Sequence, residues 1–259
     1  MRIARFTTGD DAKFAIVEGE PGDERLAVVT GDPLFTASRR TGEVVPLADV
    51  RLLVPVIPRS KVVAVGKNYA DHAKEMGGEA PAEPLLFFKP NTSVRGPGDP
   101  IELPRQSSEV HYEGELAIVI AKICKDVPLE RVPEVVAGYT CANDVTARDL
   151  QRRDGQWARA KGFDSFCPIG PYVVTGMPPE DLHLVTRLNG TVVQDTRTSM
   201  MIHDVAAIVS YVSQAFTLLP ADIILTGTPA GVGPIVEGDR VEVEIEGVGV
   251  LPNVVVRRG

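Results

Sequence analysis

The stretch VHYEGELAIVIAK, residues 110–122, has the composition of a buried strand that carries two carboxylates. Successive strand side chains point to opposite faces, so Glu113 and Glu115 share one face while Leu116 and Ile118 share the other. Two adjacent carboxylates beside a core repel each other and lose hydration, and a bound cation relieves both penalties. The alternative is that the two glutamates lie on a solvated strand face, but the apolar run around them argues against it. The stretch predicts a metal site on a central strand.

The segments around this strand favour a β-rich α+β fold. Further strands are predicted at residues 61–66, 84–90 and 222–229, with a hairpin over 240–256. Helical spacing of apolar residues predicts one long helix within HDVAAIVSYVSQAFTL, which begins at His203 or Asp204. A short helix in NYADHAKEMGG is expected to have Asn68 as its N-cap and Gly77 and Gly78 as its end. The βαβ alternation of Rossmann and barrel folds is missing, so a mixed β-roll is predicted.

The first part of the chain differs from the rest in its sequence pattern. Short alternating runs, RIARF, KFAIVE and RLAVVT, are separated by turn residues. They predict a small N-terminal α+β domain of strands with one short helix over residues 1–56. The Pro-containing segment LLVPVIPRS forms the boundary, and residues 57–259 are expected to form a metal-dependent catalytic domain.

Composition and charge exclude several classes of partner. The 259 residues carry 27 basic and 35 acidic side chains, a formal net charge of −8 without a basic run, which argues against nucleic acid and against an anionic membrane. The start, MRIARFTTGDDAKF, lacks the apolar core of a signal peptide, and the apolar runs are too short to span a bilayer. The widely spaced Cys124, Cys141 and Cys167 indicate reduced thiols. A cytoplasmic protein is expected.

A third carboxylate completes the predicted metal site. Asp144 ends the apolar run GYTCAND, although it could instead cap a helix that begins in the following residues. Three carboxylates without a histidine or cysteine form an all-oxygen ligand set. Such a set favours Mg²⁺ or Mn²⁺ over Zn²⁺.

Two further patterns indicate acid–base chemistry. His72 and Glu75 are three residues apart on the short predicted helix and share a face, where a carboxylate can orient the imidazole of a general base. A chance pair on a surface helix is the alternative. Lys161, in WARAKGFDSF, could bind a carboxylate or stabilise an oxyanion, unless it is simply an exposed lysine. The loop TGTPAGVG offers Thr228 and backbone N–H groups to an anion but lacks a P-loop's GK[ST].

Together the motifs resemble the fumarylacetoacetate hydrolase family. Seven segments occur in the family order across about three quarters of the chain, and each is weak alone. They are VGKNYADHAKEM, PLLFFKPNTSVRGPGDPIELP, VHYEGELAIVIAK, GYTCANDVTARDLQ, WARAKGFDSFCPIGPYVV, LNGTVVQDTRTSMMIHDV and IILTGTPAGVGP.

The resemblance implies a role for each candidate residue. It implies that Glu113, Glu115 and Asp144 bind Mg²⁺ or Mn²⁺. It further implies that His72 and Glu75 form a water-activating dyad on a helix that orders over the substrate, and that Lys161 contacts the reacting substrate. Positions matching Gln151 and Thr228 line the pocket, and Lys67 matches a basic position near the lid. The implied fold is a mixed β-roll of the family's C-terminal type, and the implied assembly is a homodimer.

The implied activity is cleavage of a C–C bond in a small 2-oxo acid. A 2,4-diketo acid of the acylpyruvate or fumarylpyruvate type would be hydrolysed through a metal-bound pyruvate enolate. The same residues would serve oxaloacetate decarboxylation or isomerisation of 2-hydroxyhepta-2,4-diene-1,7-dioate. A non-catalytic protein that binds metal or senses a 2-oxo acid is the alternative from a different class.

Overall fold

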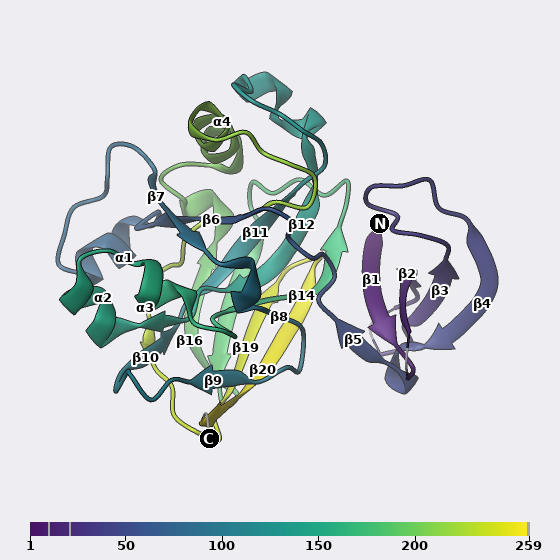
Figure 1. Ribbon diagram of the computed structural model, residues 1–259, viewed down its shortest axis with the longest axis horizontal. Helices are drawn as coiled ribbons and strands as arrows, with labels where there is room; N and C mark the ends of the chain where they lie inside the picture. The colour runs from purple at the N-terminus through teal and green to yellow at the C-terminus, as the bar shows by residue number, and fades with distance from the viewer. Residues whose placement is uncertain (10, 21, 258–259) are drawn as a thin grey trace.

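The computed structural model describes residues 1–9, 11–20 and 22–257, in which strands far outnumber helices (Figure 1). The strands that precede residue 56 are β1 (Arg2–Thr7), β2 (Ala12–Glu18), β3 (Arg25–Val29), β4 (Arg40–Pro46) and β5 (Arg51–Leu53). The later strands are β6 (Val62–Gly66), β7 (Leu85–Lys89), β8 (Val94–Arg95), β9 (Ile101–Leu103), β10 (Val110–Tyr112), β11 (Gly114–Ile120), β12 (Val136–Asn143), β13 (Thr146–Ala147), β14 (Cys167–Val174), β15 (His183–Leu188), β16 (Thr191–Arg197), β17 (Ile223–Leu225), β18 (Gly233–Pro234), β19 (Arg240–Ile245) and β20 (Gly249–Arg257). The α-helices are α1 (Ala70–Glu75), α2 (Arg148–Asp154), α3 (Ala158–Gly162) and α4 (Val205–Ala215), and short 3-10 turns occur at η1 (Leu47–Asp49), η2 (Asn91–Ser93), η3 (Leu129–Glu134) and η4 (Thr198–Met200).

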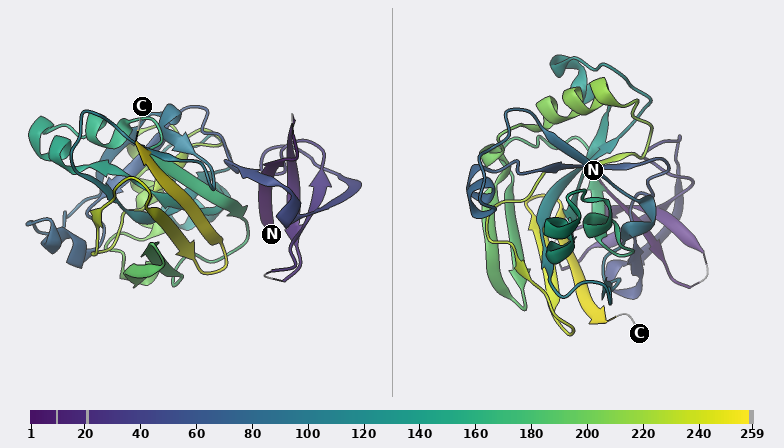
Figure 2. Two further views of the ribbon diagram at one scale, coloured as in Figure 1. Left: turned by 90° about the horizontal axis from the view of Figure 1, so that it is seen from below. Right: turned by 60° about the vertical axis from the view of Figure 1, so that its left-hand side comes forward.

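The largest sheet runs through both parts of the chain. Its strand order is β4-β3-β2-β1-β14-β12-β11-β17-β6-β7, with β5 beside β1 and β8 beside β14. The first residues of β1 pair with the end of β14, Arg2 opposite Val174, so the N-terminal strands extend the sheet of the larger part. The N-terminal strands project to one side of the molecule in two views (Figures 1 and 2). The predicted β-rich α+β roll is confirmed.

The N-terminal segment contains the predicted strands but not the predicted short helix. Within its described residues, the helical turn over Leu47–Asp49 is a single 3-10 turn. Pro46 precedes it and Val50 returns to an extended conformation, which leaves too few residues for an α-helix. We propose that residues 1–56 form a separate small domain, because β5 ends at Leu53 and the proline-containing link to β6 follows.

A second sheet packs against the large one and encloses the main core. It has the order β16-β15-β19-β20-β9, and the short strands β13, β10 and β18 form a third sheet. Ile118 of β11, Leu184 of β15, Val243 of β19 and Val209 of α4 belong to one buried cluster. Burying such a side chain contributes about 1.5–3 kcal/mol, so this cluster fixes β11 of the large sheet against the second sheet and α4.

The one long helix forms as predicted. Asp204 is its N-cap, and the Asp204 carboxylate accepts a hydrogen bond from the Ala207 N–H. Its buried face includes Ile208 and Val212, in agreement with the helical spacing. Within the described ranges, no helix combines the length and the apolarity needed to cross a membrane.

The acidic strand is interrupted at its first glutamate. β10 ends at Tyr112 and pairs with β13 and β18, whereas β11 begins at Gly114 and pairs with β12 and β17. The prediction of one continuous strand over residues 110–122 is therefore wrong. All of β11 is buried on both faces, which is typical of a strand at the centre of a large sheet. Glu113 lies at the junction between two sheets and is directed inward.

Gly114 makes the close approach of β11 to β15 possible. A methyl group at Gly114 would lie 2.0 Å from the Thr186 hydroxyl oxygen. Gly114→Ala is expected to lower stability by about 1–3 kcal/mol through overpacking, or about 2–4 °C in Tm for each kcal/mol. Differential scanning calorimetry checks this, with Gly9→Ala as the matched control, because nothing lies within 4 Å of a methyl group there. An unchanged Tm for Gly114→Ala would contradict the tight packing at this position.

Candidate active site

Three buried carboxylates meet where β10, β11 and β12 converge. Gly114 pairs with Asn143, and the Asp144 N–H donates to the Glu113 carbonyl at 2.8 Å, so the end of β12 lies beside the two glutamates. One oxygen from each of Glu113, Glu115 and Asp144 can be chosen so that all three lie within 4.8 Å of one another. The three residues are 3%, 1% and 1% exposed. The structure thus brings together the three predicted carboxylates.

Three buried cations face these carboxylates. Lys161 of α3 donates to Glu113 Oε2 at 2.6 Å and to Asp144 Oδ2 at 2.7 Å. Arg148, the first residue of α2, donates to Glu113 Oε1 at 2.5 Å, and Lys89 forms an ion pair with Asp144 Oδ1. Buried charges need such partners, because an unpaired ion loses its hydration without compensation.

Glu115 is the carboxylate that lacks a cationic partner within the described chain. Its Oε2 accepts a hydrogen bond from the Gly227 N–H at 2.6 Å. Burial and the nearby Asp144 and Glu113 charges raise its pKa well above the ordinary value. Burial also tends to raise the pKa of Glu113, but the charges of Lys161 and Arg148 outweigh this effect and lower it. The site therefore holds one carboxylate whose negative charge is poorly compensated.

The predicted His–Glu pair is formed on α1. His72 Nδ1 lies 3.0 Å from Glu75 Oε2, and Glu75 Oε1 accepts the Gly231 N–H at 3.0 Å. A carboxylate only accepts hydrogen bonds, so Nδ1 carries the proton and Nε2 is free to accept one. His72 is 5% exposed although its helix lies at the surface. The pair is therefore an ordered, buried arrangement.

The prediction that Asn68 caps α1 is wrong. Tyr69 occupies the N-cap position, and no side chain caps the helix. The Asn68 side chain instead donates to the Thr226 and His203 carbonyls and accepts the His203 N–H. These long-range bonds outweigh a local cap, and they fix the start of α1 against the chain before α4.

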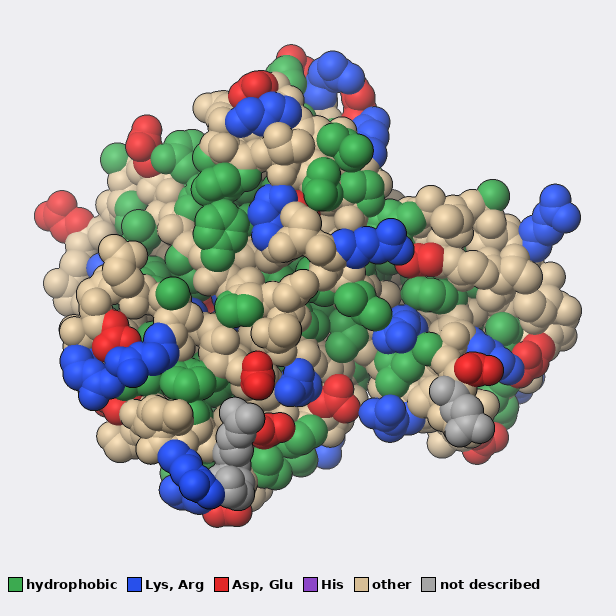
Figure 3. All heavy atoms as spheres, viewed as in Figure 1, with side chains coloured by type: hydrophobic (Ala, Val, Ile, Leu, Met, Phe, Trp, Pro, Cys, Tyr) green, Lys and Arg blue, Asp and Glu red, His purple; other side chains and the backbone are tan. Residues whose placement is uncertain are grey.

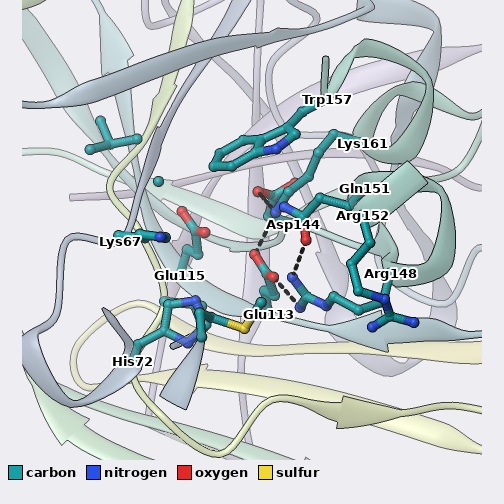
Figure 4. A pocket seen from close by; sticks show the side chains of 14 residues that line it. Lys67, His72, Glu113, Glu115, Asp144, Arg148, Gln151, Arg152, Trp157 and Lys161 are labelled. Atoms are coloured by element: carbon teal, nitrogen blue, oxygen red, sulfur yellow. Dashed lines mark hydrogen bonds and ion pairs between the residues drawn. The ribbon is translucent and has the colours of Figure 1, made fainter. Parts of the chain in front are cut away.

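The three carboxylates, Arg148, Lys161 and His72 line one cavity of about 170 Å³ (Figure 4). Eight of the nine predicted site residues line it, namely Lys67, His72, Glu113, Glu115, Asp144, Gln151, Lys161 and Thr228. The ninth, Glu75, contacts His72 from outside the lining. Lys67 adopts a left-handed backbone conformation, φ 57°, which is uncommon for a lysine and often marks a functional position.

Two of the lining residues are already engaged with the protein. The Thr228 hydroxyl donates to the Gly114 carbonyl at 2.9 Å and accepts from Gln194 at 2.8 Å, so it supports the strand between the two glutamates. Gln151 Oε1 accepts from Arg148 at 2.8 Å. Its amide nitrogen is the part of Gln151 that remains for a ligand.

Several residues of the site were not predicted. Met76 and Trp157 line the cavity, as does Arg152 of the segment RRDGQ, and Arg148 and Lys89 bind its carboxylates. Lys89 had a signal, because a lysine at the end of the apolar strand LLFFK needs a buried partner. Met76, Trp157 and Arg148 had none, since they lie on polar or mixed segments.

Comparisons with known proteins identify the family. The fumarylacetoacetate (FAA) hydrolase C-terminal model matches residues 61–256, and the Rv2993c-like N-terminal model matches residues 1–55. The chain therefore belongs to the fumarylacetoacetate hydrolase family, as its motifs predicted. It is an enzyme of this family, and its buried carboxylate triad is typical of the family's divalent-metal site.

Three relatives show which activities are named among proteins similar to this chain. The crystal structure of a 2-hydroxyhepta-2,4-diene-1,7-dioate isomerase from Mycobacterium marinum is 53% identical, with a TM-score of 0.92 over 100% of this chain and 99% of that one. Human mitochondrial oxaloacetate tautomerase FAHD2A is 46% identical over 82% of this chain and 72% of its own length. A fumarylpyruvate hydrolase from Pseudomonas aeruginosa, solved with Mn²⁺ and pyruvate, is 37% identical, with a TM-score of 0.74 over 80% of this chain and 92% of that one.

Proposed function

We propose that Glu113, Glu115 and Asp144 bind a divalent cation, Mg²⁺ or Mn²⁺. The donor set consists of oxygen atoms alone, and the uncompensated Glu115 supplies the charge that attracts a cation. The relative solved with Mn²⁺ supports the choice of metal. When bound there, the cation would hold the carboxylate and 2-oxo oxygens of a substrate and stabilise negative charge on the 2-oxo oxygen.

The charge of the site fits a doubly anionic substrate. The site holds three carboxylates and three buried cations, Lys89, Arg148 and Lys161, so its formal charges sum to zero, although the three cations pair with Glu113 and Asp144 and not with Glu115. A divalent cation would bring the sum to +2. An enolised 2-oxo acid carries one negative charge on its carboxylate and one on its oxygen. A second carboxylate on the substrate would find Lys67 and Arg152 in the cavity lining.

We propose His72 as the residue that moves the proton. Its Nδ1–H is held by Glu75, so Nε2 can accept a proton from the substrate and return it elsewhere. Lys161 is proposed to stabilise negative charge on the substrate beside Glu113 and Asp144. Lys67 and Gln151 are proposed to bind its oxygens, and Thr228 to complete the pocket wall.

The reaction that we propose is the interconversion of a 2-hydroxy-2-enoate with its 2-oxo form in a dicarboxylic acid. A proton leaves the oxygen at C2 and a carbon of the same conjugated system gains one, so no bond of the carbon skeleton breaks. The buried His72–Glu75 pair beside the carboxylate triad carries this proposal. The isomerase and tautomerase relatives, at 53% and 46% identity, support it over the C–C hydrolysis first expected from the sequence.

C–C bond hydrolysis is the second candidate. The fumarylpyruvate hydrolase relative, with pyruvate in its structure, favours it. In that reaction His72 would activate a water molecule, which isomerisation does not need. Oxaloacetate decarboxylation would use the same carboxylates and Lys161 without this water.

Parallel assays separate these reactions. The purified protein is mixed with enol-oxaloacetate, 2-hydroxyhepta-2,4-diene-1,7-dioate, acetylpyruvate or fumarylpyruvate, with Mg²⁺ or with EDTA. We expect Mg²⁺-dependent loss of the enol or diene absorbance without pyruvate. Faster release of pyruvate from the diketo acids would overturn the proposal in favour of hydrolysis, and pyruvate from oxaloacetate would favour decarboxylation.

The metal site predicts a pH-dependent stabilisation. The pKa of Glu115 is raised by burial and by Asp144 and Glu113, so the folded protein holds this proton more tightly than the unfolded chain. Stability of the metal-free protein therefore falls as the pH rises from the ordinary value of 4.5 towards the raised pKa. Glu113, whose pKa is lowered, stays ionised over that range.

Bound Mg²⁺ should remove this penalty. The rise in Tm caused by Mg²⁺ is thus expected to grow as the pH rises above the ordinary value of 4.5, as thermal melts with Mg²⁺ and with EDTA would show. A Mg²⁺ effect of the same size at every pH would contradict the assignment of Glu115.

We further propose a homodimer. β7 is an edge strand of the large sheet, and its Leu85 and Phe88 side chains are exposed. Phe88 stacks edge-to-face with Phe216, and hydrophobic side chains gather on the face that carries β7 (Figure 3). Such an apolar edge is suited to a partner surface. Sedimentation equilibrium tests this, and a monomer at micromolar concentration would reject it.

A further inference from the structure

Lys89 is buried behind the carboxylates and lies outside the cavity lining. It is the last residue of β7, and its side chain is fully buried. Its ammonium group bonds to Asp144 Oδ1 and lies 3.4 Å from the Val145 carbonyl oxygen. A buried lysine in an apolar edge strand is costly unless it has a specific task or partner. Among the described residues, the carboxylate that pairs with Lys89 is Asp144, which belongs to the proposed metal site.

The two lysines hold opposite oxygens of Asp144. Lys161, which lines the cavity, bonds to Oδ2 and also to Glu113. Lys89, at the end of β7, bonds to Oδ1. A carboxylate fixed through one oxygen cannot rotate freely, so its other oxygen keeps a constant direction. The Thr146 hydroxyl also donates to the Asp144 carbonyl at 2.8 Å, which fixes the backbone of the same residue.

We propose that Lys89 is a positioning residue that holds Asp144 Oδ1 and thereby fixes the orientation in which this carboxylate would bind the metal. The inference rests on the proposed metal site and goes beyond it, because it names an outer residue and one oxygen. Partners that orient metal ligands typically change metal affinity by about 10- to 100-fold. Lys89 lies outside the cavity lining, so its effect on substrate or metal would be transmitted through Asp144.

A second Lys–Asp pair, in which the aspartate is buried and the lysine is partly buried, provides the control. Lys61 lies 2.5 Å from Asp222, whose side chain is fully buried and also accepts the Leu219 and Lys61 N–H groups. Neither Lys61 nor Asp222 lines the cavity. Breaking this pair should affect stability alone.

The test measures Mn²⁺ binding to the full-length protein by isothermal titration calorimetry, with the spectrum of bound Mn²⁺ by electron paramagnetic resonance as a second readout. Lys89→Met is expected to weaken Mn²⁺ binding about 10- to 100-fold and to broaden the spectrum, because Asp144 loses its fixed orientation. Lys61→Met is expected to lower Tm while the Mn²⁺ affinity stays at the wild-type value.

Lys89→Gln is the conservative variant, since its amide keeps an N–H donor for Asp144 Oδ1 without the charge. It should recover part of the lost affinity, and it keeps the test informative if Lys89→Met does not fold. Wild-type affinity in both folded Lys89 variants would overturn the inference and leave the metal site intact. Failure of the wild-type protein itself to bind Mn²⁺ would instead reject the proposed function.

Discussion

Replacement of His72 by alanine is expected to lower kcat for proton transfer by about 10²- to 10⁴-fold, the usual contribution of a positioned general base. His72 is the histidine that lines the cavity, and its ring is oriented by Glu75. In the part of the chain that the structure describes, the hydrogen bond of the imidazole goes to Glu75 and not to the three carboxylates that would serve a metal, so Mn²⁺ affinity is expected to change far less than kcat. Steady-state kinetics and Mn²⁺ titration on the same preparation measure both quantities.

Glu75→Gln is the companion variant. It keeps an oxygen for the Gly231 N–H but weakens the preference for the Nδ1–H tautomer. A smaller loss than that of His72→Ala is expected, together with a shift in the pH profile of kcat. Proton transfer at the wild-type rate in His72→Ala would reject the role of the His72–Glu75 pair in this reaction.

Glu115→Gln is expected to have two opposite effects. Mn²⁺ affinity should fall by more than about 100-fold, because even the loss of an outer partner of a ligand typically costs about 10- to 100-fold. Stability in EDTA should rise, since glutamine keeps an acceptor for the Gly227 N–H and removes a charge that burial, Asp144 and Glu113 disfavour. Each kcal/mol gained would raise Tm by about 2–4 °C.

The matched control is Glu237→Gln. Glu237 forms an exposed ion pair with Arg257 at 3.5 Å, a type of contact that contributes about 0–1 kcal/mol. It should change neither Mn²⁺ affinity nor Tm appreciably. The claim is that Glu115 binds the cation and destabilises the metal-free protein. Unchanged Mn²⁺ affinity in Glu115→Gln, or a lower Tm in EDTA, would contradict it.

Local sequence patterns predicted the elements in which local forces dominate. The helix after Asp204 follows from apolar spacing and a capping aspartate, both of which act within a few residues. The strands β1, β2 and β3 follow from alternation between turns. The meeting of Glu113, Glu115 and Asp144 needed only that two neighbouring strands pair.

Long-range contacts account for the parts that the sequence left unpredicted. Asn68 is a good cap by composition, yet it bonds to residues around positions 203 and 226. The break at Glu113 depends on β10 joining a sheet with β13 and β18, which no local pattern encodes. Lys89 reaches Asp144 across 55 residues of sequence.

The choice of reaction also lies beyond the residue pattern. Isomerisation, decarboxylation and hydrolysis would use the same carboxylates and Lys161, and they differ in whether His72 acts on substrate or on water. The motifs therefore predicted the type of intermediate but not the reaction. The relatives named as isomerase and tautomerase support isomerisation.

The most direct test follows the transferred proton itself. The protein is incubated in D₂O with 2-hydroxyhepta-2,4-diene-1,7-dioate and Mg²⁺, and the products are read by nuclear magnetic resonance beside His72→Ala and EDTA controls. We predict a 2-oxo-ene-dioate with one deuterium at the newly protonated carbon, formed only with Mg²⁺ and His72. An unaltered substrate, a cleaved product, or the same product at the same rate with EDTA would contradict metal-dependent proton transfer by this site.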